Sequence, residues 1–136
     1  MKHRNAVAAF GIALVAVTLA GEATAATPIT TSVTILNANG ERFTGKVSSP
    51  KKACLKGRRV TLYISMKSVA RRNYGYPGYG VVGRATTRSN GTWEVKRGAE
   101  EAFQEGDYRA YVAAKRVDAG GKSLLCASRW GPTRHA

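Results

Sequence analysis

The chain has 136 residues, and its 22 Lys and Arg against 8 Asp and Glu give a formal net charge of +14 at pH 7. This length leaves room for one domain after an N-terminal leader. Of the two histidines, His3 lies in the leader and His135 is next to the C-terminus. The body of the chain therefore offers no His-based catalytic or metal-ligand set, and we expect no enzyme activity, no metal and no cofactor.

The N-terminus has the three parts of a secretory signal peptide. A cationic start, Met1 to Arg4, precedes the uncharged and mostly apolar run 6–20, and a small-x-small cleavage pattern ends at Ala25. The apolar run is shorter than the roughly 20 residues that a membrane-spanning helix needs. We expect removal of residues 1–25 on export, with an uncleaved anchor as the alternative. Residues 26–136 are then a single secreted, extracellular domain with no transmembrane anchor.

Beyond the leader, short alternating or β-branched runs are separated by Gly, Asn, Pro and charged residues, a pattern typical of all-β proteins. In chain order they predict seven strands, over 32–36, 43–48, 59–65, 80–87, 92–96, 107–117 and 122–129. Asn90-Gly91 is typical of a tight hairpin turn between the fourth and fifth strands. Seven strands in this length predict an antiparallel sandwich of the immunoglobulin-like or prealbumin-like type.

The two cysteines, Cys54 and Cys126, predict one disulfide, because an isolated pair in a small exported domain is most often bridged. The bridge closes a loop of 72 residues. On the chain-entropy model, a loop of this length stabilises the fold by about 4 kcal/mol. It would tie the last predicted strand to the body of the sandwich.

Turn glycines and core aromatics at four places carry a resemblance to a known group of domains. They are Phe43-x-Gly45-x-Val47, Cys54-x-x-x-Arg58-Arg59-Val60-x-Leu62, Gly83-x-x-x-Thr87-x-x-x-Gly91-x-Trp93 and Gly106-x-Tyr108-x-Ala110-x-Val112. The pattern, over residues 43–128, resembles small secreted bacterial β-sandwich modules of the carboxypeptidase-regulatory-like and transthyretin-like kind. The resemblance implies an extracellular immunoglobulin-like module without catalysis. It implies no functional residue, because the shared positions are structural.

A loop between the third and fourth predicted strands is the first candidate binding site. It combines arginines, which bind phosphate or carboxylate, with tyrosines, which stack on sugars or bases. Its residues are Arg71, Arg72, Tyr74, Tyr76 and Tyr79. The alternative is a surface loop whose tyrosines fold back over the sandwich edge.

A second basic cluster surrounds Cys54. It consists of Lys51, Lys52, Lys56, Arg58 and Arg59. Such residues bind anions, but lysines at a strand edge also prevent edge-to-edge aggregation, which is the alternative for this cluster.

Without Lys2, Arg4 and Glu22 of the leader, 20 basic and 7 acidic residues remain. Two functional hypotheses follow. The first is a non-enzymatic interaction module for an unknown protein or cell-surface partner. The second is a polyanion-binding protein for a cell-wall polymer, an acidic polysaccharide or nucleic acid. Steep loss of affinity with salt would distinguish the second from the first.

Overall fold

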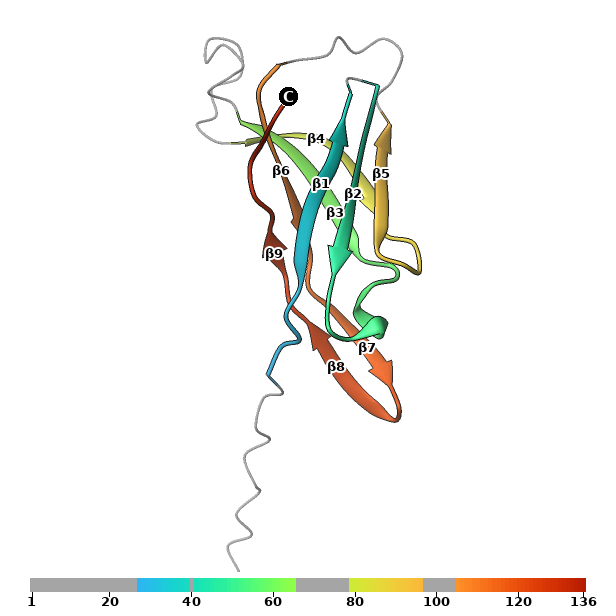
Figure 1. Ribbon diagram of the computed structural model, residues 1–136. Helices are drawn as coiled ribbons and strands as arrows, with labels where there is room; N and C mark the ends of the chain where they lie inside the picture. Colours follow the sequence, from blue (N-terminus) through green and yellow to red (C-terminus); the bar gives the residue numbers. More distant parts are fainter. Residues whose placement is uncertain (1–26, 40, 66–78, 97–104) are drawn as a thin grey trace, which may run out of the picture.

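The computed structural model describes residues 27–39, 41–65, 79–96 and 105–136, and the predicted leader, residues 1–25, lies outside them (Figure 1). Within these ranges the protein forms ten strands in three sheets, with one short 3₁₀ helix, η1. None of the described residues belongs to a helix long and apolar enough to cross a membrane. The elements are β1 Ser32–Ala38, β2 Arg42–Ser48, η1 Lys52–Cys54, β3 Arg59–Ser65, β4 Tyr79–Thr86, β5 Thr92–Lys96, β6 Asp107–Val112, β7 Lys115–Ala119, β8 Lys122–Cys126, β9 Arg129–Trp130 and β10 Arg134–His135.

Two antiparallel sheets make up the body of the molecule. The smaller has the strand order β1-β2-β5, and the larger has the order β10-β6-β3-β4, with β9 also paired to β6. In Figure 1, β1 and β2 lie across β3 and β6, which run behind them. Contacts of β1 with β6 and of β4 with β5 join the two layers. The arrangement is all-β and consistent with a β-sandwich.

The core lies between these two sheets, because alternate residues of each strand point inward. In β3, for example, the inward residues are Val60, Leu62 and Ile64. Rings from opposite sheets meet where Phe43 of β2 and Tyr108 of β6 stack with centroids 4.7 Å apart. The full set is Val33, Ile35, Phe43, Val47, Val60, Leu62, Ile64, Trp93, Val95, Tyr108, Ala110 and Val112. The all-β prediction is confirmed.

The prediction of seven strands is wrong in the C-terminal third. The strand expected over 107–117 divides at 113–114 into β6 and β7, where the chain leaves the larger sheet. The amide of Ala113 still bonds to the carbonyl of Arg59, and pairing with β8 begins at Lys115. The strand expected over 122–129 divides into β8 and β9, and β10 is an addition to the predicted set. The prediction failed because the hydrophobic alternation continues through 113–114 and 127–128, where the strands end. The strands β9 and β10 have only two residues each, too few to show an alternation.

β7 and β8 form a separate hairpin that projects at the lower end of the molecule in Figure 1. The predicted disulfide joins it to the body: the Cα atoms of Cys54 and Cys126 are 5.6 Å apart and bonded through their sulfurs. Both cysteines are buried. Ile29 also bridges Cys126 in parallel, so the start of the described chain lies beside β8. The disulfide prediction is therefore confirmed.

Candidate functional site

The predicted binding loop falls mostly outside the described residues. Arg71, Arg72, Tyr74 and Tyr76 lie there, and Tyr79 is the first residue of β4, paired with Ser65. A binding role for this loop stays a prediction.

The structure divides the second basic cluster. Lys51, Lys52 and Lys56 are exposed around η1, and Arg59 is exposed at the start of β3. Arg58 has no exposed surface at all. Arg58 therefore does not belong to a surface cluster, because its side chain points into the protein rather than toward solvent.

The guanidinium of Arg58 binds the nearby Cys54 and three segments that are distant in sequence. Nη1 donates to Thr31 Oγ1 at 3.2 Å and to the Cys54 carbonyl at 2.9 Å. Nη2 donates to the carbonyls of Ala113 and Ala127 at 2.9 and 2.8 Å. All four acceptors are neutral, and burial lowers the pKa of Arg58 below its usual value. An arginine stays protonated even so, which makes it a structural tie beside the disulfide.

Lysines surround a hollow next to η1, here called the lysine hollow. Lys52, Lys56 and Lys115 line it together with Ala53, Gly57, Ser89 and Val117, and its volume is about 540 Å³. The Lys115 ammonium donates to the Gly57 carbonyl at 3.1 Å, which holds it at the rim. No described acidic residue lines this hollow, so the charges at its lining are those of the three lysines, which attract an anionic group.

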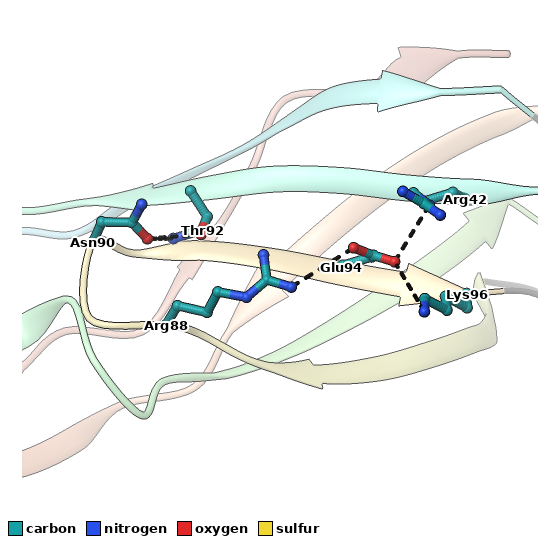
Figure 2. Close-up of polar contacts among 6 residues, drawn as sticks. All are labelled: Arg42, Arg88, Asn90, Thr92, Glu94 and Lys96. Atoms are coloured by element: carbon teal, nitrogen blue, oxygen red, sulfur yellow. Dashed lines mark hydrogen bonds and ion pairs between the residues drawn. The ribbon is translucent and has the colours of Figure 1, made fainter.

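A second cationic surface lies on the outward face of the smaller sheet, around Glu94 of β5 (Figure 2). Its carboxylate oxygens lie 3.3 Å from Arg42 Nε, 3.7 Å from Arg88 Nη2 and 3.8 Å from Lys96 Nζ. Asn90 holds the turn beside Arg88 by accepting hydrogen bonds from the amide and hydroxyl of Thr92. Three cations thus share one carboxylate, which leaves a net positive surface.

The outward face of the larger sheet carries an aromatic cluster, which consists of Tyr63, Tyr111 and Trp130. The Trp130 ring centroid lies 5.1 Å from that of Tyr63 and 5.0 Å from that of Tyr111. The guanidinium carbon of Arg109 lies 5.0 Å from the same Trp130 centroid. Trp130 is 40% exposed, whereas the other tryptophan, Trp93, is 1% exposed in the core.

Sequence reasoning missed this aromatic cluster. The alternation of β3 did place Tyr63 outward, and that of β6 placed Tyr111 outward, opposite their buried neighbours. Trp130 gives no such signal because it lies in a two-residue strand, whose pairing with Tyr111 is set by the tertiary structure.

The charged contacts that join two described residues involve the carboxylates of Glu94 and Asp107. Glu94 pairs with three cations, and Asp107 contacts the exposed His135, with 2.8 Å between Oδ1 and Nδ1. Besides the buried Arg58, eleven further described Lys and Arg residues make no ion pair. They are Lys46, Lys51, Lys52, Lys56, Arg59, Arg84, Lys115, Arg116, Lys122, Arg129 and Arg134. Among residues 27–39, 41–65, 79–96 and 105–136, no group of three or more His, Cys, Asp or Glu is placed to hold a metal ion.

Comparisons with known proteins found no match to this chain among family models, curated proteins or solved structures.

Proposed function

We propose that this protein is a secreted, non-catalytic module of the immunoglobulin-like or transthyretin-like type that binds an anionic polymer outside the cell. The signal-peptide pattern of residues 1–25 and the buried disulfide support export. The sequence resemblance supports the fold type. The excess of Lys and Arg over Asp and Glu supports an anionic polymer as the ligand.

One observation carries this proposal: the exposed cations are distributed over several faces and outnumber the carboxylates near them. The lysine hollow has three cations and no carboxylate in its lining. The surface around Glu94 has three cations and one carboxylate. A polymer with repeated negative charges can contact several such surfaces at once, whereas a small anion occupies only one. Release of counterions on each contact then favours binding.

A protein partner is the second candidate function, and one feature of β1 favours it. β1 is an edge strand of the smaller sheet, and its Leu36 side chain is 58% exposed. No described strand pairs with the outer edge of β1, although the Ile35 carbonyl on that edge accepts a hydrogen bond from Arg134. The exposed apolar side chain of Leu36 suits contact with a partner protein.

Binding of the purified protein to dextran sulfate and to dextran tests the proposed function. The two polymers share a sugar backbone and differ in charge. At low salt we expect saturable binding to dextran sulfate, with an affinity at least about tenfold higher than for dextran. Equal binding to the two polymers, or binding to neither, would contradict polyanion binding and favour the protein partner.

A further inference from the structure

We propose that the outward face of the larger sheet is a binding surface for an acidic polysaccharide. The aromatic cluster of Tyr63, Tyr111 and Trp130 stacks against the faces of sugar rings, and Arg59 and Arg84 bind carboxylates of the same chain. This inference rests on the proposed polyanion binding and goes further, since it names a site and a class of polymer: sugars that carry carboxylates.

The aromatic cluster has the composition of a sugar-binding platform. Aromatic side chains offer large, rigid and amphipathic contact area at low entropic cost. The rings of Tyr63 and Tyr111 both contact Trp130 and are inclined to it by 44° and 46°. Because Trp130 nevertheless keeps 40% of its surface exposed, it offers area to a ligand.

Backbone and side-chain contacts hold Trp130 in position before any ligand binds. Arg109 Nε donates to the carbonyl of Gly131 at 3.0 Å while its guanidinium packs on the indole. The amide of Gly131 donates to the carbonyl of Ala110 at 2.8 Å. Gly131 is buried, and a Cβ there would collide with the carbonyl oxygen of Val33, so the chain approaches β1 closely at this residue. An exposed but fixed aromatic ring loses little entropy on binding, which favours a binding role.

The arginines lie on the same face as the aromatic cluster. Strand register places Arg84 opposite Thr61, Thr61 opposite Tyr111, and Tyr111 opposite Trp130, in one row across four strands. Neighbouring strands are about 4.8 Å apart, so the row spans roughly 15 Å, enough for several sugar rings. Arg59, two residues before Thr61 on β3, points to the same side.

Charge and composition favour an acidic polysaccharide over other anionic polymers. Arg59 and Arg84 are exposed and make no ion pair. The described carboxylate on this face, Asp107, contacts His135. Single-stranded nucleic acid also stacks on aromatic rings, but it needs a groove of cations that follows every phosphate. Here three aromatic residues share the face with Arg59, Arg84 and Arg109, and Arg109 already packs on Trp130, which leaves two arginines for ligand charges. This ratio suits a polymer with fewer charges per ring.

Two probe polymers separate the sugar contact from the charge contact. Polygalacturonate carries carboxylates on sugar rings, whereas poly-L-glutamate carries carboxylates without rings. We expect Trp130→Ala to weaken binding of polygalacturonate by at least about tenfold, the size of loss that follows removal of an aromatic residue stacked on a nucleic-acid base. We expect its binding of poly-L-glutamate to change less than about twofold. Leu36→Ala is the matched control, since it truncates an exposed apolar residue on the other sheet.

Two variants that have the same net charge test whether the arginines of this face bind the polymer. Arg84→Gln should weaken polygalacturonate binding several-fold more than Lys122→Gln, which removes the same charge from the β7–β8 hairpin. Both side chains are exposed and outside the core, so both variants should fold.

Tryptophan fluorescence tests the site without any mutation, and it stays informative if Trp130→Ala fails to fold. The chain has two tryptophans, Trp93 buried and Trp130 exposed. Acrylamide should quench Trp130, and polygalacturonate, but not poly-L-glutamate, should protect it.

Three outcomes would overturn the inference. The first is equal binding of both polymers with no protection of Trp130; salt-sensitive binding in that case would leave the proposed function intact. The second is tighter, Trp130-dependent binding of oligodeoxythymidylate, which would assign the surface to nucleic acid. The third is absence of binding to either polymer and to dextran sulfate, which would refute the proposed function as well.

Discussion

Replacement of Arg58 by methionine removes the buried guanidinium while roughly preserving its length and apolar stem. The variant loses all four hydrogen bonds that Arg58 donates, to Thr31, Cys54, Ala113 and Ala127. Three of the four acceptors are backbone carbonyls, which cannot turn away to find other donors. The substitution therefore tests whether this one side chain holds the ends of β6 and β8 against η1.

Two opposing terms set the size of the effect. Hydrogen bonds from a charged donor contribute about 1.5 kcal/mol each at the low end, so four of them amount to about 6 kcal/mol. Removal of a buried charge recovers part of its desolvation cost, about 3 kcal/mol. The net loss is about 3 kcal/mol, a large part of the roughly 5–15 kcal/mol typical of a whole domain. For a domain of this size it corresponds to a fall in Tm of roughly 10–20 °C.

Thermal unfolding, followed by circular dichroism with the disulfide intact, measures this loss. Arg59→Met is the matched control, since the adjacent arginine is exposed, and it should shift stability by less than about 0.5 kcal/mol. Arg58→Lys should also destabilise, because one ammonium cannot reach four acceptors in a planar array. A Tm for Arg58→Met equal to that of Arg59→Met would refute the structural role of the guanidinium.

The remaining predictions concern other parts of the molecule. Replacing Cys54 and Cys126 together by alanine should lower the free energy of unfolding in urea by about 4 kcal/mol; an unchanged midpoint would contradict this. Gly91→Ala should destabilise by about 1–3 kcal/mol, because φ there is +85° and a Cβ would collide with the Val47 carbonyl oxygen. A Tm of Gly91→Ala equal to that of the unmodified protein would contradict this prediction. Glu94→Gln should tighten binding of dextran sulfate and change stability by less than about 1 kcal/mol. Weaker binding would mean that the cations around Glu94 take no part.

Local alternation is enough to predict most of the core. In β3 and β6 every second residue is apolar, so the pattern by itself directs Val60, Leu62, Tyr108 and Ala110 inward. The disulfide could be predicted from the number of cysteines together with the expectation of a signal peptide. The inward residues depend on the alternation within single strands, and the disulfide depends on the number of cysteines. Both can be read from the sequence without knowledge of the fold.

Features set by long-range contacts could not be predicted. Arg58 and Arg59 are adjacent and chemically identical. The alternation of β3 puts Arg58 on the side of Val60, but only the carbonyls that Ala113 and Ala127 supply explain how a charged side chain can be buried there. The switch of the chain at Ala113 from the larger sheet to the β7–β8 hairpin leaves no break in the hydrophobic pattern. The aromatic cluster around Trp130 likewise depends on the pairing of β9 with β6. A strand of only two residues has no alternation pattern from which this pairing could be predicted.

The salt dependence of binding tests the central claim, polyanion recognition, most directly. The affinity of the purified protein for dextran sulfate would be measured at several salt concentrations between about 50 and 200 mM, a range over which counterion release changes affinity strongly. Polyanion binding predicts a linear fall of log K with log salt, with a slope that corresponds to several contacts, and a shallower slope when Lys52 and Lys56 are replaced by glutamine. An affinity that does not change with salt, or the same slope in that variant and the unmodified protein, would contradict a binding role for these cations.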